Sequence, residues 1–93
     1  MEFSVLYSPR FERDFDRLIR THQVSSALLD EIKSVLQIDP YNRSRAHQIK
    51  KLKDISYGDG QWCLRVWRFR VRYDMTDSAA RLHSIKPRPE AYR

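Results

Sequence analysis

The sequence contains a single cysteine, Cys63, and no long run of apolar residues. One cysteine excludes an internal disulfide and any metal site built from several cysteines. The lack of a run of about eighteen apolar residues excludes a membrane-spanning helix. The first ten residues, MEFSVLYSPR, also lack the basic start and apolar stretch of a secretory signal. We therefore expect a cytoplasmic protein with no membrane partner.

Several residue patterns that mark common enzyme sites are also missing. The sequence has no glycine-rich loop to cradle a phosphate, no nucleophilic serine elbow and no pair of carboxylates at a useful spacing. Its three histidines, His22, His47 and His83, are not spaced as metal ligands. The sequence therefore predicts no metal site and no cofactor. We expect His83 to be a polar residue of a strand rather than a general base.

The charge of the chain is positive and unevenly distributed. The 93 residues suffice for one domain over residues 1–93, and the net charge is +6. Residues 1–40 hold five basic and seven acidic residues, whereas residues 61–93 hold eight basic and three acidic ones. A positive field in the C-terminal half favours a nucleic acid or an acidic protein as partner. The alternative is a solvated basic surface without a ligand.

The first half of the chain has the pattern of a strand followed by two helices. Residues 3–7 alternate as a strand does, and Ser8-Pro9 suits the cap and first position of a helix. Apolar residues then recur at helical spacing over 11–19 and again over 28–36. The second helix should end at Asp39-Pro40, because a residue before proline avoids the helical region. These elements predict a helical hairpin.

The second half has the pattern of β-structure. Residues 41–60 are basic and are expected to be irregular, whereas residues 61–75 alternate aromatic or branched residues with arginines. Fifteen residues exceed a typical strand, so we predict two strands that turn near Trp67-Arg68, and a last strand over 81–86. The predicted fold is α+β. An N-terminal strand and a two-helix hairpin pack on a small antiparallel sheet that contains a C-terminal three-strand meander.

The alternation also predicts a basic sheet face. Arg68, Arg70 and Arg72 should point to the same side, and Arg65 could join them from the neighbouring strand. Guanidinium groups match the geometry of phosphate, although an open face of solvated arginines is the alternative. In the tail, Tyr92 could stack on a base, or it could only fill the edge of the core.

Three stretches resemble a known family. Residues 64–75, LRVWRFRVRYDM, resemble the central hairpin of the RelE/ParE toxin superfamily, and residues 85–93, IKPRPEAYR, resemble its closing pattern. The segment KKLKD over 50–54 is similar to the leucine-lysine step before the hairpin. The resemblance covers residues 49–93, whereas the first half agrees only in the order of elements. Trp67-Arg68 stands where the family usually has a glycine and an acid, and two prolines stiffen the tail.

This resemblance implies the toxin of a bacterial type II toxin–antitoxin system. RelE-like members are metal-independent endoribonucleases, or mRNA interferases, that cut mRNA in the ribosomal A site and inhibit translation. Their partners are a cognate antitoxin, the ribosome and mRNA. ParE-like members share the fold but inhibit DNA gyrase without cutting RNA. A degenerate toxin that only binds an antitoxin is a third alternative.

Position by position, the resemblance also assigns roles to residues. The hairpin arginine that binds the scissile phosphate matches Arg70, and the terminal tyrosine that orients the 2′-hydroxyl or stacks on the base matches Tyr92. The candidate catalytic residues are Arg65, Arg70, Lys86, Arg88 and Tyr92. The candidate RNA-binding residues are Lys50, Lys51, Lys53, Arg68 and Arg72. Because arginine stays protonated, a lysine whose pKa is lowered by neighbouring cations is the better proton carrier.

Overall fold

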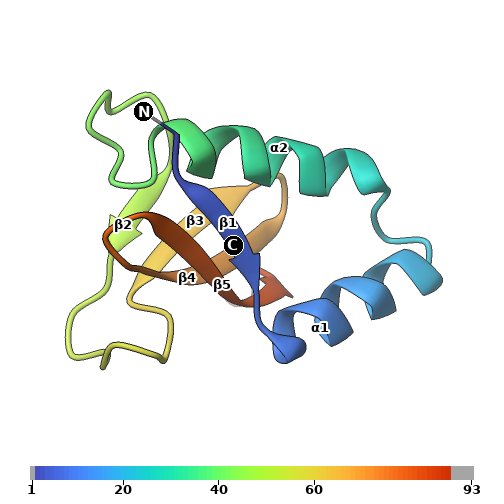
Figure 1. Cartoon of the computed structure of the whole chain (residues 1–93). Helices are drawn as coiled ribbons and strands as arrows, with labels where there is room; N and C mark the ends of the chain where they lie inside the picture. Colours follow the sequence, from blue (N-terminus) through green and yellow to red (C-terminus); the bar gives the residue numbers. More distant parts are fainter. Residues whose placement is uncertain (1, 89–93) are drawn as a thin grey trace.

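The computed structural model describes residues 2–88, and these form two helices and five strands (Figure 1). The elements follow one another as β1 (Ser4–Tyr7), α1 (Pro9–Arg20), α2 (Ser26–Ile38), β2 (Ile49–Lys51), β3 (Trp62–Val66), β4 (Phe69–Met75) and β5 (Ala79–Pro87). No helix in this described part of the chain is long and apolar enough to cross a membrane.

The strands form one mixed sheet in the order β1-β5-β4-β3-β2. The last three strands form the predicted antiparallel meander, and β1 lies at the edge of the sheet beside β5. Two details differ from the prediction. The pairing of β1 with β5 is parallel, and the segment expected to be irregular contributes β2, a three-residue edge strand. So short a strand carries too few residues to show alternation in the sequence.

The start of α1 and the end of α2 lie where the sequence predicts them. The hydroxyl oxygen of Ser8 accepts a hydrogen bond from the Phe11 amide at 3.1 Å, and Pro9 occupies the first position of α1. At α2, Ser25 caps the start by accepting from the Ala27 amide at 3.3 Å. This helix ends at Ile38, and its C-cap is Asp39, the residue before proline.

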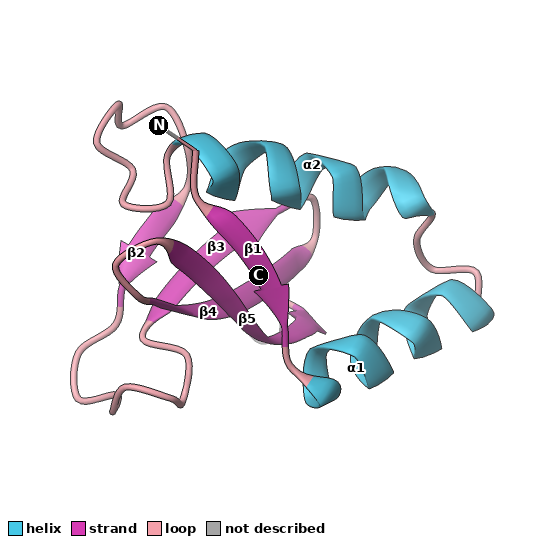
Figure 2. Ribbon diagram, in the orientation of Figure 1, coloured by secondary structure: helices cyan, strands magenta, loops and turns pink. Residues whose placement is uncertain are grey.

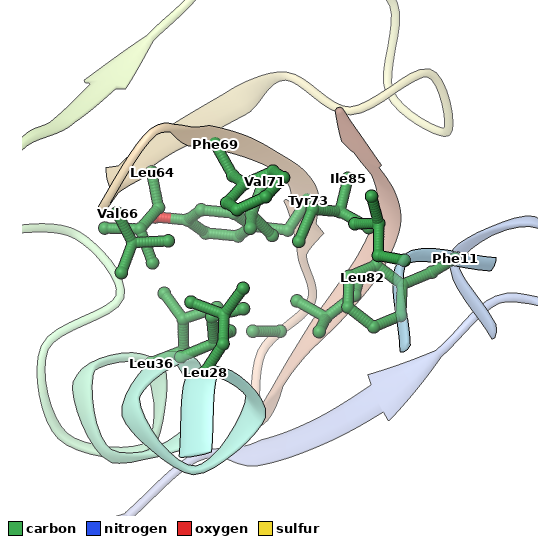
Figure 3. Close-up of a cluster of buried hydrophobic side chains, with 13 residues drawn as sticks. Phe11, Leu28, Leu36, Leu64, Val66, Phe69, Val71, Tyr73, Leu82 and Ile85 are labelled. Atoms are coloured by element: carbon green, nitrogen blue, oxygen red, sulfur yellow. The ribbon is translucent and has the colours of Figure 1, made fainter. Parts of the chain in front are cut away.

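The core lies between the helices and one face of the sheet. The helices contribute Phe11, Leu18, Leu28, Ile32 and Leu36. From the sheet come Leu64, Val66, Phe69, Val71, Tyr73, Ala80, Leu82 and Ile85. Figure 3 shows the α2 leucines opposite the side chains of β3 and β4. All thirteen side chains are at most 8% exposed, so alternate residues of β3 and β4 point to this face.

The β3–β4 turn consists of Trp67 and Arg68, as the length argument predicted. Trp67 adopts a positive φ of 53° and is 53% exposed. Arg68 corrects one prediction, because it lies in the turn before β4 rather than on the strand with Arg70 and Arg72. Its guanidinium carbon is 6.0 Å from the ring centroid of Phe69, a residue of the core face.

Candidate nucleic-acid interface

The face of the sheet opposite the core carries rows of polar and basic side chains. Strand pairing places Arg65 directly across from Arg70, and Arg70 across from Lys86. The next row along the strands contains Lys50, Cys63, Arg72 and Ser84. Three strands thus align three cations in a single cross-strand row, a like-charge arrangement that is unfavourable without an anion or another compensating group.

Two hollows open on this face, and Arg70 and Arg72 line both. The larger, of about 560 Å³, lies towards β2 and includes Lys50, Cys63 and Arg65. The smaller, of about 220 Å³, lies towards α1 and includes Arg10, His83, Ser84 and Lys86. A chain of phosphates that crossed from one hollow to the other would therefore pass the two shared arginines.

The loop between β2 and β3 is tied to this face by two residues of β4. Arg72 donates from Nε to the Gly60 carbonyl oxygen at 3.0 Å and from Nη2 to that of Asp59 at 2.7 Å. The buried Asp74 carboxylate accepts from the amides of Gly60 and Gln61 at 3.0 and 3.1 Å. The loop, at the lower left of Figure 2, therefore has a fixed base, and two of the five N–H donors of Arg72 serve structure.

Burial and charge act in opposite directions on Cys63. Burial raises the pKa of this thiol, whereas Arg70, Arg72 and Arg65 each act to lower it. The net direction is upward, so Cys63 is a protonated thiol at neutral pH. In the wall of the larger hollow, Cys63 is therefore a small neutral side chain between cations.

The structure brings some predicted site residues together and separates others. Arg65, Arg70, Arg72, Lys86 and Lys50 line the two hollows. Arg88 lies next to Lys86 in a neighbouring hollow against α1, with Asp14 and Arg17. Lys51 points away from the hollows, with Nζ 5.7 Å from the Trp62 ring centroid, and Lys53 is exposed beyond the end of β2. Tyr92 lies outside the described residues.

Two ionisable side chains in the smaller hollow were not predicted as site residues. Arg10 comes from the first turn of α1, and His83 comes from β5. A cation in the first turn opposes the helix dipole, and that mismatch is a signal by which the sequence could have marked Arg10. For His83 the sequence carried no signal, because its position depends on an irregularity in strand pairing.

No family model matches the sequence, and no curated protein matches it. Solved structures do share its fold. The Escherichia coli DinJ–YafQ toxin–antitoxin complex contains a chain that superposes with a TM-score of 0.70 at 15% identity, covering 94% of this chain and 93% of that one. YafQ from E. coli strain BL21(DE3) superposes with a TM-score of 0.69 at 17% identity, covering 98% and 97%. The predicted α+β fold is thereby confirmed, and this chain shares it with both solved structures.

Proposed function

We propose that this protein is the toxin of a bacterial type II toxin–antitoxin system and acts as a ribosome-dependent mRNA endoribonuclease. The fold it shares with YafQ from the DinJ–YafQ toxin–antitoxin complex supports the broader class. The observation that supports the reaction is the row of Arg65, Arg70 and Lys86 on an open face between two hollows. Action on translating ribosomes places the protein in the cytoplasm.

The row suits the chemistry of RNA cleavage. When a 2′-oxygen attacks the adjacent phosphorus, negative charge builds up on the phosphate oxygens. Arg70 is half-buried, pairs with Arg65 and Lys86 and lines both hollows, so a phosphate bound in either hollow would lie beside it. Cations that are already in place need little reorganisation as the reaction proceeds. The ribosome would supply the remaining alignment of the mRNA.

The test compares Arg70→Ala with Arg13→Ala, which removes an exposed arginine of α1 that lines neither hollow. Each variant and the wild type are induced in a bacterial host, and cleavage of a reporter mRNA is mapped by primer extension. We expect the wild type and Arg13→Ala to arrest growth and cut the transcript. We expect Arg70→Ala to cut it roughly 10²–10³-fold more slowly, the loss typical of one transition-state charge donor.

Three other results would overturn parts of this proposal. Cleavage that is unchanged in Arg70→Ala removes the cationic row from the reaction. Growth arrest with DNA damage and intact mRNA identifies a gyrase inhibitor instead. No arrest by the wild type identifies a module that only binds an antitoxin.

The same proposal includes a cognate antitoxin that covers the basic face. The DinJ–YafQ structure is a toxin–antitoxin complex, and the net charge of +6 on this chain favours an acidic partner segment. Association with such a partner is expected to slow steeply as salt is added, because electrostatic steering is screened. A small protein encoded next to this one, co-expressed with it, should restore growth.

A further inference from the structure

His83 occupies an irregular place in the sheet. Arg72 pairs with Ser84, but the next residue of β4, Tyr73, pairs with Leu82. His83 is therefore the extra residue of a β-bulge, a feature that redirects side chains. In regular alternation it would share the core face with Ile85. Instead it lines the smaller hollow beside Ser84 and Lys86.

Two hydrogen bonds from Ser8 hold the backbone of the bulge in place. Ser8 donates from its amide to the Leu82 carbonyl oxygen and from its hydroxyl to the His83 carbonyl oxygen, each at 3.0 Å. The imidazole Nδ1 lies 3.2 Å from the hydroxyl oxygen of Ser84. Gly60 packs behind the strand so closely that a Cβ there would lie 3.4 Å from the Cβ of His83. With Nδ1 engaged by Ser84, Nε2 is the ring nitrogen left to exchange a proton with a ligand.

The surroundings of the ring favour its neutral form. Burial lowers the pKa of His83 below 6.5, and the cations of Arg10 on α1 and Arg72 on β4 lower it further. The carboxylates of Asp74 on β4 and Asp59 in the loop act in the opposite direction without reversing the shift. Further cations line the hollows around the ring, namely Arg70, Lys86 and Arg81. At neutral pH the imidazole is therefore a base next to phosphate-binding arginines.

We propose that His83 is the general base of the cleavage reaction, an assignment that rests on the proposed function. Nε2 of His83 takes the proton from the 2′-hydroxyl while the 2′-oxygen bonds to phosphorus, and the bond from phosphorus to the 5′-oxygen breaks. The products are a 2′,3′-cyclic phosphate and a 5′-hydroxyl, whose proton comes from the ammonium of Lys86. Lys86 then regains its proton from solvent, and His83 releases one to it. Arg70 stabilises the charge, and His83 supplies the proton acceptor that no arginine can be.

The experiment measures single-turnover cleavage of mRNA on programmed ribosomes between about pH 5 and pH 8.5. We compare the wild type with His83→Asn, whose amide can still reach Ser84. His22→Asn is the matched control, since His22 is exposed, has a positive φ of 58° that asparagine tolerates, and lies outside the hollows.

For the wild type and His22→Asn we expect the rate to fall as the pH drops through a midpoint below 6.5, because protonation removes the base. For His83→Asn we expect a loss of about 10²–10⁴-fold at neutral pH and no such midpoint. As a second variant, His83→Ala should regain activity when imidazole is added, a rescue that a purely structural role does not give.

The outcomes separate the two proposals. If the wild type cuts RNA, but His83→Asn keeps its rate and pH profile, or His83→Ala gains nothing from imidazole, the role of His83 is wrong and the proposed function stands. If the wild type cuts no RNA at all, both are overturned.

Discussion

The two faces of the sheet are built from the same strands and have opposite characters. On β3 and β4, Leu64, Val71 and Tyr73 are at most 2% exposed and pack against the helices, whereas Arg65 and Arg70 alternate with such residues and point the other way. The apolar face stabilises the fold by removing hydrocarbon from water. The opposite face places cations directly across from one another, which costs stability. The apolar face maintains the core, whereas the opposite face combines a row of cations with two residues, Arg72 and Asp74, that hold the loop between β2 and β3.

The largest effect should come from the apolar face. Ile32 of α2 is fully buried, and Ile32→Ala removes its contacts and leaves a cavity in the core. We expect the free energy of unfolding in urea to fall by about 2–5 kcal/mol. Ile38→Ala is the matched control, because Ile38 ends the same helix and is 71% exposed. It should change the value by about 0.5 kcal/mol or less, and equal losses in both variants would contradict the assigned core.

A smaller effect is expected at the point where the loop meets the basic face. Gly60 has a φ of 80°, and a Cβ there would lie 2.8 Å from the Cβ of Arg72, so Gly60→Ala is both strained and overpacked. Gly58 has a φ of 99° but open space around it, so Gly58→Ala is strained only. We expect Gly60→Ala to be less stable than Gly58→Ala by about 1–3 kcal/mol in urea unfolding. A difference near zero would mean that the loop is not seated on Arg72.

The smallest effect on stability should come from the basic face. Arg65→Gln removes one cation from the row of three, so the free energy of unfolding should stay constant or rise by about 0.5 kcal/mol. Binding to a single-stranded RNA oligonucleotide should weaken, and the slope of log affinity against log salt should become shallower by about one. Arg20→Gln, on the far end of α1, should leave that slope unchanged. A marked loss of stability in Arg65→Gln would show that the row serves the fold instead.

Local signals in the sequence predicted most of the fold. Ser8-Pro9 and Asp39-Pro40 mark helix ends because capping and proline geometry act within a few residues. Alternation over 69–75 likewise assigned the side chains of β4 to their faces, with Phe69, Val71 and Tyr73 in the core. The turn at Trp67 carried no such signal, because its positive φ is imposed by the hairpin and not by the residue.

The candidate site was only partly predictable, because it depends on contacts between distant residues. Alternation and the resemblance predicted Arg65, Arg70 and Lys86, which the structure aligns in one row. The sequence could not show that Arg72 is used to hold Asp59 and Gly60, thirteen and twelve residues away. Nor could it show the bulge at His83, which arises from how β5 pairs with β4.

The parallel pairing of β1 with β5 also affects when the protein can become functional during synthesis. Val5 pairs with Ala80, and Ser8 bonds to His83 across 75 residues. β1 can therefore pair with β5 only after almost the whole chain has been synthesised. Contacts between residues this distant in sequence also slow folding. A nascent chain that has only reached the helices has neither hollow. The row of cations and the smaller hollow are therefore complete only after β5 has emerged from the ribosome.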